Sequence, residues 1–493
     1  MLKIYNPNTK EKLEFKPLKQ NEVKVYHCGP TVYNYAHIGN LKTYVGNDVV
    51  VRIMRYLGFN VNVLMNLTDI DDKTIRDSQK VGESLKDFTE KFTKIFLKDI
   101  DKLNIVRANN IVPISTVIPE MVRMINTMLR RGFAYISDDN SIYFKVSKFP
   151  KYGKLANLDM SGMISGARID NDEYDKDQAS DFALWKAWKK EDGENFWEEE
   201  FEIGGKKIKL KGRPGWHIEC SACNMKHFGQ QIDLHTGGID NLFPHHQNEV
   251  AQTEACTRKE FSKYWIHHGH LTVNGQKMAK SKGNFYTLED LEKLFDKGKI
   301  KVSTKKMLYR ATRFIFINGK YRDSIDFSFD KLLQASNTLE GIDETLKNLK
   351  KYLSKKIKNK GISKDFREYL QIVISDYIKC IEDDFNLPGA LAVIFGFQKK
   401  INLIMRDNDF SHEDILAIVD MYRTFDQVLG VIDFSFFDEE DEKIPKELLA
   451  LLEERNKLKK EKDFVNADKI RGKINDAGYK IIDTREGSSL EKI

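Results

Sequence analysis

The pattern between residues 23 and 67 constrains the fold of this chain more than any other feature. Residues 23–28 form a short apolar run typical of a buried strand, and Gly29-Pro30 follows it as a turn. Apolar residues then recur at helical spacing over 38–56, and a β-branched run over 61–67 predicts a second strand. Strand, turn, helix and strand form a βαβ unit. The sequence therefore predicts an α/β fold built on a parallel, Rossmann-like sheet.

The length of 493 residues suggests about three compact units, and shifts in composition suggest where the chain divides. An aromatic and charged segment with an acidic stretch at 170–177 interrupts the α/β pattern, which resumes with strand-like runs at 232–234 and 265–273. Helical stretches follow at 329–353, 364–385, 389–405 and 412–429, and an acidic link at 438–442 precedes a last one at 446–477. We expect a Rossmann-like domain (1–112 and 212–273), a connective insertion (113–211), a loop region (274–330), a helical bundle (331–437) and a small C-terminal domain (438–493).

Composition excludes several classes of protein. Hydrophobic residues make up 41% and charged residues 31%, which supports packed cores and argues against global disorder. Residues 1–9 are polar and no later stretch offers about 18 uncharged apolar residues, so we expect a cytoplasmic protein without a membrane partner. The 5 cysteines are too few and odd in number for a disulfide framework. A net charge of +6 permits a nucleic-acid partner but does not require one.

The first candidate site is His37-Ile38-Gly39-Asn40, where the first strand leads into its helix. A helix N-terminus attracts phosphate, and a glycine lets a ligand approach the backbone closely. His37 and Asn40 can donate hydrogen bonds to phosphate oxygens. Taken alone, however, these residues are better explained as an ordinary helix start with a polar cap.

A second candidate site, Lys277-Met278-Ala279-Lys280-Ser281, lies in a loop between Gly275 and Gly283. Two lysines on a mobile loop can close over a triphosphate and neutralise the charge that grows on the leaving pyrophosphate. A solvated lysine loop is the simpler explanation of this segment alone. Together, the two candidate sites form a highly specific pair.

Four further residues could bind a metal ion. Cys28 follows the first strand, Cys220 ends the segment 215–220, and His245 and Glu249 are four residues apart, which places them on one face of a helix. Two thiolates, an imidazole and a carboxylate form a plausible zinc shell.

The spacing of the cysteines leaves another metal site open. Cys223 forms a Cys-x-x-Cys pair with Cys220, and His246 adjoins His245. A structural zinc knuckle that includes Cys220 and Cys223 is as consistent with the spacing as the first set. A buried cysteine is also more often inert packing than a ligand.

The segments 37–40 and 277–281 resemble the two signatures of class I aminoacyl-tRNA synthetases, a His-Ile-Gly-His tetrapeptide and a Lys-Met-Ser-Lys-Ser loop. Asn40 replaces the second histidine and keeps a hydrogen-bond donor, whereas Ala279 replaces the central serine and removes one hydroxyl. Both lysines remain, so the resemblance implies an active enzyme. It makes His37, Asn40, Lys277 and Lys280 the expected catalytic residues. It extends the expected ATP site to Gly39, Met278 and Ser281, with Mg²⁺ bound to the ATP.

Nearly the whole chain is similar to the cysteinyl-tRNA synthetases. The similarity includes 29–33, 68–73, 384–386, 462–464, 467–468 and Arg471, and it is weakest over 171–211. In that family the residues matching Cys28, Cys220, His245 and Glu249 bind zinc, and the position of Cys223 usually has no cysteine. The resemblance therefore favours the first ligand set, with one Zn²⁺ per chain. It also implies that Thr68, Trp216, His235 and Asp240 surround the bound amino acid.

The resemblance implies ATP-dependent activation of L-cysteine to cysteinyl-adenylate and its transfer to the 3′-terminal adenosine of tRNA(Cys), by a monomer. A hydrophobic pocket would distinguish cysteine from serine and alanine by only about 1 to 3 kcal/mol of binding free energy. Zinc would bind the substrate thiolate and so reject the other two amino acids. The C-terminal domain would bind tRNA, with Arg455, Lys459 and Arg471 facing the anticodon stem, and 274–330 would be the signature-loop and stem-contact region. A ligase joining cysteine to a small amine, or a non-catalytic RNA-binding relative, stays open as an alternative.

Overall fold

The computed structural model describes most of the chain, which separates into two compact units, 1–432 and 433–493. The described residues are 1–7, 9–158, 168–169, 181–353, 362–406, 410–438, 445–484 and 487–492. The acidic stretch at 170–177, the acidic link beyond residue 438, the first part of the divergent segment 171–211 and the side chain of Lys280 lie outside the described residues. Each unit is described by itself.

A five-stranded parallel sheet forms the centre of the first unit, which confirms the predicted α/β fold. Its strands lie in the order β13-β12-β3-β4-β5. Their bounds are β3 Glu22–His27, β4 Asn60–Leu67, β5 Asn110–Pro113, β12 Ile232–Gly238 and β13 Ser262–His268. The strand order reverses between β3 and β12. In open parallel sheets, ligands bind at the carboxyl ends of the strands beside such a reversal.

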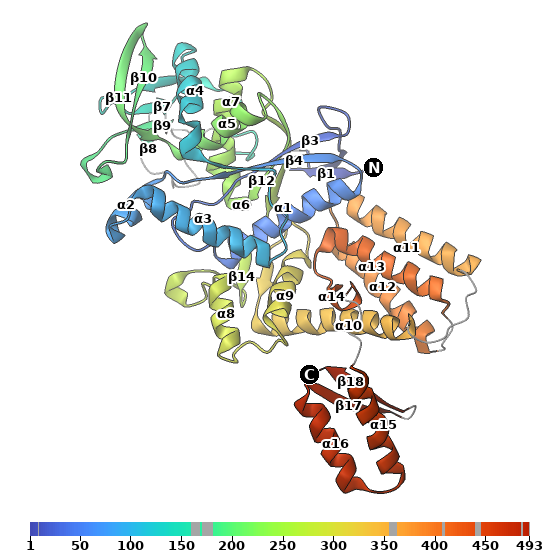
Figure 1. Ribbon diagram of the computed structural model, residues 1–493. Coiled ribbons are helices and arrows are strands. Elements are labelled where there is room, and N and C mark those ends of the chain that lie inside the picture. The colour runs from blue at the N-terminus through green and yellow to red at the C-terminus, as the bar shows by residue number, and fades with distance from the viewer. Residues whose placement is uncertain are drawn as a thin grey trace. The chain divides into compact units, whose positions relative to one another are not determined.

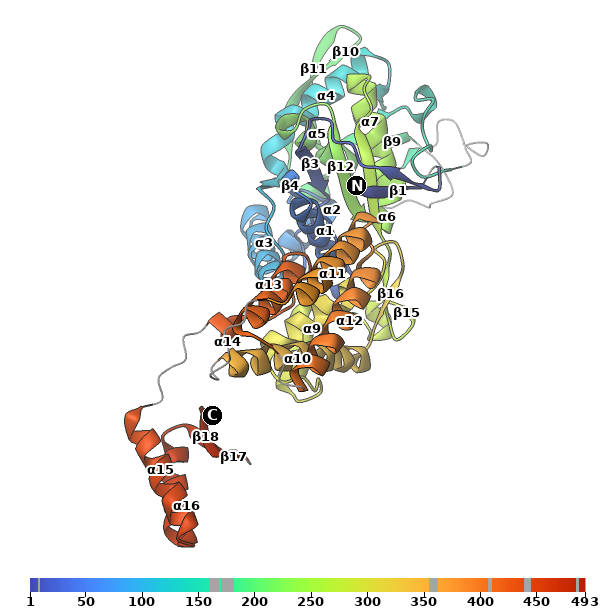
Figure 2. The same ribbon diagram turned by 90° about the vertical axis from the view of Figure 1, so that its right-hand side faces the viewer.

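Helix α1 (Ile38–Tyr56) connects β3 to β4 and has the bounds that its apolar spacing predicts. Leu41, Val45 and Ile53 on its apolar face are fully buried. Figures 1 and 2 show α1 on one side of β3, β4 and β12, and α5 (Trp216–His227) with α7 (Gln247–Thr257) on the other. Helices therefore cover both faces of the sheet, as its continuous apolar strands require. Two further helices follow β4, namely α2 (Asp72–Val81) and α3 (Leu85–Lys102).

An insertion between β5 and α5 carries a second, mainly antiparallel sheet of six strands. Its elements are η1 Ile114–Val117, α4 Ile118–Arg130, β6 Ala134–Ile136, β7 Ile142–Phe144, η2 Val146–Lys148, β8 Arg168–Ile169, β9 Asp181–Ala187, η4 Lys190–Asp192, β10 Trp197–Ile203 and β11 Lys206–Pro214. In the long β10–β11 hairpin, glutamates face lysines across the strands, including Glu200 opposite Lys209 and Glu202 opposite Lys207. Opposite charges therefore balance along this hairpin.

The predicted strand over 265–273 is wrong as a single element. Strand β13 ends at His268, and the chain turns at Gly269 before β14 (Leu271–Val273) begins. Strand β14 joins a separate three-stranded sheet with β15 (Gln276–Lys277) and β16 (Ile325–Phe327). The apolar pattern continues across the turn, and so the sequence alone does not reveal the break.

Short helices connect these sheets to the rest of the unit. They are α6 Ile239–Asn241 and η5 Leu242–His246 before α7, and η6 Lys280–Lys282, α8 Leu288–Asp296 and α9 Lys305–Ile317 after β15. A hairpin of β1 (Lys3–Asn6) and β2 (Glu11–Glu14) begins the chain. Helix α9 is tied to α1 by a buried ion pair, in which Arg313 Nη2 lies 2.5 Å from Asp48 Oδ2.

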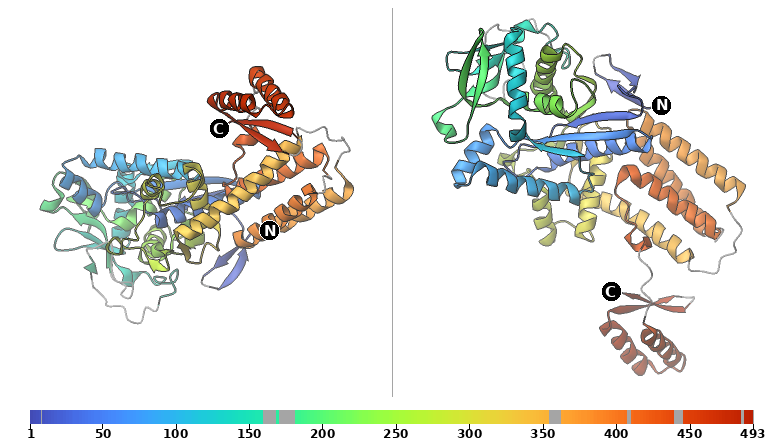
Figure 3. Two further views of the ribbon diagram at one scale, coloured as in Figure 1. Left: turned by 90° about the horizontal axis from the view of Figure 1, so that it is seen from below. Right: turned by 45° about the horizontal axis from the view of Figure 1, so that its top comes forward.

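Four helices follow β16 and form the predicted bundle (Figure 3). They are α10 Phe329–Leu353, α11 Lys364–Glu382, α12 Leu387–Arg406 and α13 His412–Leu429. Helix α11 ends before the predicted Phe385, because Asp384 and Phe385 have positive φ angles of 58° and 55° that a helix cannot contain. Among the described residues, none of the helices combines the length and apolar composition needed to cross a bilayer.

The second unit is small and has its own core. It contains α14 Ser435–Asp438, α15 Lys446–Lys460, α16 Phe464–Asp476, β17 Tyr479–Thr484 and β18 Gly487–Lys492. Leu448, Leu452, Ile470 and Ile474 form the apolar centre. Arg455 is 5% exposed and donates two hydrogen bonds to Asp483, at 2.6 and 2.8 Å. The expectation that Arg455 faces RNA is therefore wrong, since its guanidinium is committed to the fold of the unit.

Candidate functional site

The candidate site lies at the carboxyl ends of β3 and β12, where the strand order of the parallel sheet reverses. A cavity of about 330 Å³ opens there. Its walls combine the residue after β3, the start of α1, the residues after β12, the turn after β13 and the signature loop. Residues from the two predicted signatures and one predicted metal ligand line it, namely His37, Gly39, Asn40, Lys277, Met278 and Cys28.

The first signature caps helix α1. His37 Nδ1 accepts a hydrogen bond from the Asn40 backbone N–H at 3.2 Å, and Asn40 Oδ1 accepts one from the His37 backbone N–H at 3.3 Å. The polar-cap explanation is thus correct, but the same two residues also line the cavity. Because Nδ1 is the acceptor, the neutral His37 ring carries its proton on Nε2. Nε2 of His37 and the amide nitrogen of Asn40 are therefore the groups that can donate to a phosphate.

The second signature lies directly against the first. A Cβ built on Gly39 would come within 2.5 Å of Met278 Cε. The Phe285 ring meets the His37 ring edge to face at 5.0 Å, and the Ile38 backbone N–H donates to the Tyr286 carbonyl at 2.9 Å. Residues far apart in the sequence therefore form one wall of the cavity.

Asn284 and Asp326 hold the signature loop in shape. Asn284 Oδ1 accepts from the Ala279 backbone N–H at 2.9 Å, and its Nδ2 donates to the Lys277 carbonyl at 3.2 Å. Asp326 Oδ1 accepts from the Gly275 N–H at 2.6 Å, at the turn before the loop. Lys277 and Ser281 are exposed, as residues that close over a ligand must be.

The four predicted metal ligands come together in one buried cluster. Cys28 follows β3, Cys220 lies on α5, His245 on η5 and Glu249 on α7. The shortest separations are 3.2 Å from His245 Nε2 to Glu249 Oε1 and 3.4 Å from Cys220 Sγ to His245 Nε2. Cys28 Sγ lies 3.8 Å from Glu249 Oε1 and 4.0 Å from Cys220 Sγ. Ligand atoms of a tetrahedral zinc site are about 3.3 to 3.8 Å apart, so the cluster has the size that zinc requires.

A second set of donors overlaps the first. Cys28, His235, His246 and Glu249 also lie within reach of one ion, with Cys28 Sγ at 3.2 Å from His246 Nε2. By contrast, Cys223 belongs to neither cluster found among the described residues. It is buried in the apolar core, where burial raises the pKa of its thiol. The Cys220–Cys223 knuckle therefore has no geometric support.

Aromatic rings and further histidines surround the cluster. Trp216 stacks on His245 with ring centroids 4.2 Å apart, and His217 Nδ1 lies 3.0 Å from His245 Nδ1. His246 Nδ1 lies 2.9 Å from His267 Nε2. Burial lowers the pKa of His245 to about 4 and that of His267 to about 3, so these rings are neutral at pH 7. Neutral imidazole is the form that binds a metal.

The residues predicted to surround the amino acid fall into two groups. Asp240 lines the cavity, and its Oδ2 lies 3.4 Å from His270 Nδ1. Thr68, Trp216 and His235 lie outside the cavity lining, beside the metal cluster. Thr68 donates to Glu219 Oε2 at 2.8 Å, and His235 Nε2 lies 2.9 Å from Glu249 Oε2.

Sequence reasoning missed one wall of the cavity, the turn His268-Gly269-His270. It also missed Glu219, His217 and His267 around the metal cluster. The run His267-His268-Gly269-His270 inside the predicted strand 265–273 was the available signal, because polar residues at the carboxyl edge of a parallel sheet often bind ligands.

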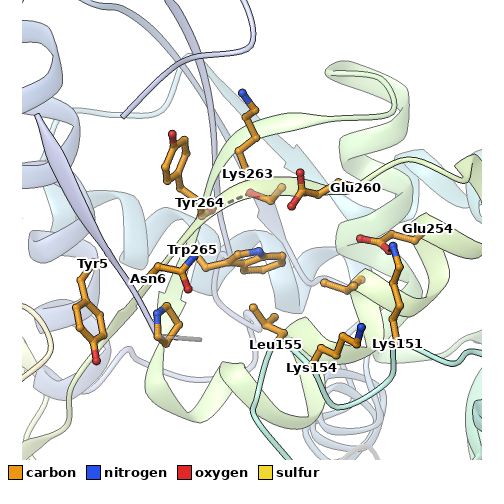
Figure 4. A pocket seen from close by; sticks show the side chains of 13 residues that line it. Tyr5, Asn6, Lys151, Lys154, Leu155, Glu254, Glu260, Lys263, Tyr264 and Trp265 are labelled. Carbon is orange, nitrogen blue, oxygen red and sulfur yellow. Dashed lines mark hydrogen bonds and ion pairs between the residues drawn. The ribbon is translucent and has the colours of Figure 1, made fainter. Parts of the chain in front are cut away.

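A larger cavity, of about 510 Å³, is lined by Val250, Glu254 and Trp265 among others and contains no residue of either signature. Figure 4 shows Trp265 among its lining residues, with Lys151 beside Glu254, whose charged atoms are 3.5 Å apart. Trp265 also stacks on His235, with ring centroids 4.8 Å apart. Trp265 is thus shared between the wall of this cavity and the surroundings of the metal cluster.

Comparison with known proteins agrees with this geometry. The chain matches the families described as "tRNA synthetases class I (C) catalytic domain" over residues 14–337 and "DALR domain" over residues 376–433. A cysteine–tRNA ligase of Brachyspira hyodysenteriae is 40% identical over 489 residues, which cover 98% of each protein. That of Methanosarcina mazei is 40% identical over 494 residues, or 100% of this chain and 99% of that protein.

Solved structures share the fold at low sequence identity. The LeuRS of Agrobacterium radiobacter K84, in a ternary complex with tRNA and LeuAMS, has a TM-score of 0.60 at 10% identity and covers 85% of each chain. The methionyl-tRNA synthetase of Mycobacterium tuberculosis, in complex with methionyl-adenylate, has a TM-score of 0.53 at 12% identity. It covers 83% of this chain and 90% of that one. At such identities the likeness concerns the fold alone.

Proposed function

The chain belongs to the cysteine–tRNA ligases, which are class I aminoacyl-tRNA synthetases, and from this premise we propose how its residues perform the reaction. The enzyme activates cysteine with ATP and transfers it to tRNA. In our proposal the buried cluster binds one zinc ion and the adjoining cavity binds ATP with Mg²⁺. The observation that carries the proposal is that Cys28 belongs to both, since it lines the cavity and is also a member of the metal cluster.

Cys28, Cys220, His245 and Glu249 would hold the zinc ion. The donor set supports this metal, because two thiolates, an imidazole and a carboxylate suit zinc better than the harder ions. When bound, zinc would accept the substrate sulfur as a thiolate and lower its pKa, which distinguishes cysteine from serine. Because Cys28 also lines the cavity, the zinc-bound cysteine substrate would lie next to the ATP.

The second donor set provides a direct test of the ligands. We expect Cys220→Ser and His245→Asn to lower the zinc content and raise the KM for cysteine, whereas Cys223→Ser and His246→Asn keep the metal. Zinc content is measured by elemental analysis of the purified variants. Loss of zinc from His246→Asn with full zinc in His245→Asn would assign the metal to the Cys28, His235, His246 and Glu249 set instead.

Adenylation would rest on positioning and charge. The cysteine carboxylate attacks the α-phosphate of ATP, pyrophosphate leaves, and cysteinyl-adenylate forms. His37 Nε2 and the Asn40 amide would donate to phosphate oxygens at the positive end of α1. Lys277 and Lys280 would neutralise the charge on pyrophosphate, with Gly39, Met278 and Ser281 shaping the site around them. No protein nucleophile is needed.

Amino-acid binding would use the residues beside the metal. Trp216 is half-buried and stacked on His245, and we propose that it contacts the substrate side chain. Thr68 and His235 would support the amino-acid site indirectly. Thr68 donates a hydrogen bond to Glu219, and His235 is hydrogen-bonded to the proposed zinc ligand Glu249. Asp240, at the cavity wall, would face the amino group.

Transfer ends the reaction when the 2′- or 3′-hydroxyl of the terminal adenosine of tRNA(Cys) attacks the adenylate. We propose that the small C-terminal domain binds this tRNA, and that the enzyme is a cytoplasmic monomer. Charging of total tRNA with each amino acid in turn tests the proposal. Charging with cysteine alone is expected, and charging with another amino acid would overturn the role of the metal in selection.

The other two functions considered from the sequence lose their support. Relatives named cysteine–tRNA ligases match 98% and 100% of this chain, including the bundle and the C-terminal unit. A ligase with a small amine as acceptor has little use for those regions. A non-catalytic RNA-binding protein has no use for the signature loop or the buried thiols.

A further inference from the structure

Asp384 lies in the helical bundle, yet its contacts lead to the ATP cavity. The sequence motif Asp384-Phe385-Asn386 connects α11 to α12, and the reaction steps proposed above give it no role. Asp384 and Phe385 both have positive φ angles, 58° and 55°. Such conformations cost free energy in residues other than glycine, and they persist only where the surrounding structure fixes them.

The Asp384 carboxylate binds the loop that precedes β16. Oδ1 accepts hydrogen bonds from the Tyr321 hydroxyl and the Tyr5 backbone N–H, both at 2.9 Å. Oδ2 accepts one from Arg322 Nη2 at 2.7 Å, and the Asp384 side chain is only 4% exposed. A nearly buried carboxylate with three donors holds its partners firmly, because losing the charge would leave Arg322 without its anion.

The same loop holds the turn that walls the ATP cavity. The Gly269 N–H donates to the Tyr321 carbonyl at 2.8 Å. A Cβ on Gly269 would meet the Arg322 carbonyl oxygen at 2.6 Å and that of Asp323 at 2.4 Å, so the two backbones are in direct contact. The ring of Tyr321 also meets His268 edge to face at 5.9 Å. His268, Gly269 and His270 all line the cavity.

Helix α1 holds the turn from its other side. The buried Lys42 Nζ donates to the Gly269 carbonyl at 2.6 Å, and His268 Nε2 lies 2.8 Å from Asn47 Oδ1. Both polar backbone groups of Gly269 are therefore bound: the carbonyl by Lys42 of α1, and the N–H by the loop that Asp384 binds. The position of the turn depends on both attachments.

We infer that Asp384 is a positioning residue for ATP: through Tyr321 and Arg322 it fixes the His268-Gly269-His270 wall, so the helical bundle sets the affinity of the cavity for the nucleotide. This inference rests on the ATP cavity proposed above. It assigns a task to the bundle within the first half-reaction, before any tRNA is bound.

The decisive variants are Asp384→Asn and Tyr321→Phe, in the full-length zinc-loaded enzyme. Asparagine tolerates the left-handed conformation and keeps the size of the side chain, so the backbone is preserved while the charge is lost. Tyr321→Phe removes one hydroxyl and keeps the ring. In ATP–pyrophosphate exchange, we expect the KM for ATP to rise about three- to thirtyfold in Asp384→Asn, and less in Tyr321→Phe. The KM for cysteine should change less than about twofold, because the metal cluster is untouched.

A matched control separates positioning from general loosening. Arg310 and Asp343 form another arginine–aspartate pair, with two hydrogen bonds of 2.7 Å, between α9 and α10 and away from the cavity. Asp343→Asn should lower the melting temperature by about as much as Asp384→Asn does, and it should leave the KM for ATP unchanged. Two outcomes would overturn the inference. One is a rise of the KM for ATP in Asp343→Asn equal to that in Asp384→Asn, and the other is an unchanged KM for ATP in both Asp384→Asn and Tyr321→Phe.

Lys277→Ala, measured in parallel, distinguishes failure of the inference from failure of the proposed site. Normal exchange in Lys277→Ala would overturn the ATP cavity itself. Impaired exchange in Lys277→Ala together with a normal KM for ATP in Asp384→Asn would overturn the positioning role alone.

Discussion

Met278 of the signature loop lies against Gly39 at the start of α1, so closely that a Cβ on Gly39 would meet Met278 Cε at 2.5 Å. The His37 ring is also within 3.0 Å of that position. The two signatures therefore pack as one surface, and a side chain added at Gly39 would have to displace Met278 or the His37 ring.

Gly39→Ala should push the signature loop away from α1 and raise the KM for ATP by about tenfold, which corresponds to about 1.4 kcal/mol. Steady-state ATP–pyrophosphate exchange measures this effect. Gly396→Ala is the matched control, since nothing lies within 4 Å of its position in α12. That control should leave the KM unchanged and raise stability by up to about 1 kcal/mol. A normal KM in Gly39→Ala would show that the loop adapts without loss.

Removal of the metal should lower both stability and cysteine activation. The cluster joins β3, α5, η5 and α7, so an ion bound there connects four segments of the first unit. We expect a strong chelator to lower the melting temperature and abolish cysteine-dependent exchange, and added Zn²⁺ to restore both. Without chelator, Cys220→Ser should already have the melting temperature of the metal-free protein, and the chelator should not lower it further. Full activity in metal-free protein would contradict the selection role.

Asp99 on α3 should make stability depend on pH. Burial raises its pKa to about 6, Lys102 opposes the shift, and Glu292 adds to it. A carboxyl with a raised folded pKa contributes stability that is present below the unfolded value of about 3.9 and is lost as the pH rises through the folded value. Asp99→Asn should therefore raise the free energy of unfolding at pH 7.5 by about 1 to 2 kcal/mol. Urea unfolding at pH 4, 6 and 7.5 measures this.

Asp101→Asn provides the control for Asp99, because Asp101 is half-exposed and paired with Arg107 at the surface. It should leave the pH dependence between 4 and 6 intact. If Asp99→Asn retains the wild-type slope in that interval, Asp99 is not the group responsible.

The buried pair of Arg313 and Asp48 should be costly to break from one side. Each side chain is 1% exposed, and Arg313 also donates to the carbonyls of Leu103 and Leu429. Arg313→Met leaves a buried carboxylate without this partner, which should lower the free energy of unfolding by about 3 to 5 kcal/mol. Arg107→Met, which breaks an exposed pair, should have little effect. Arg52 Nε also lies 2.7 Å from Asp48 Oδ2. Similar losses in the two variants, measured by urea unfolding, would show that Arg52 satisfies Asp48 without Arg313.

Truncation after Ile432 should separate the two half-reactions. The second unit has its own core, and none of its described residues belongs to the lining of the ATP cavity or to the metal cluster. Exchange of ATP with pyrophosphate should continue at the full-length rate, while the KM for tRNA(Cys) in charging rises by about tenfold or more, since about 1.4 kcal/mol is a tenfold change. An unchanged KM for tRNA would contradict the proposed role of this unit.

Local patterns were sufficient for much of the fold. The bounds of α1, α10 and α13 follow from apolar spacing, because an amphipathic helix repeats every 3.6 residues whatever it packs against. The βαβ order predicted the parallel sheet, and the two signatures identified the ATP chemistry. The break at Gly269 and the end of α11 before Asp384 were not predicted, because both depend on contacts with distant segments.

The thiol–imidazole–carboxylate cluster shows the same division. The sequence by itself determined which residue types could bind a metal and that His245 and Glu249 would share a side, since four residues make about one helical turn. Spacing could not choose between Cys220 and Cys223, which lie about one turn apart on α5, and only the family resemblance favoured Cys220. The packing of α5 separates the two: it turns Cys220 toward Cys28, 192 residues earlier in the chain, and Cys223 into the apolar core. Distances between remote segments depend on how helices and strands pack, and no local spacing contains them.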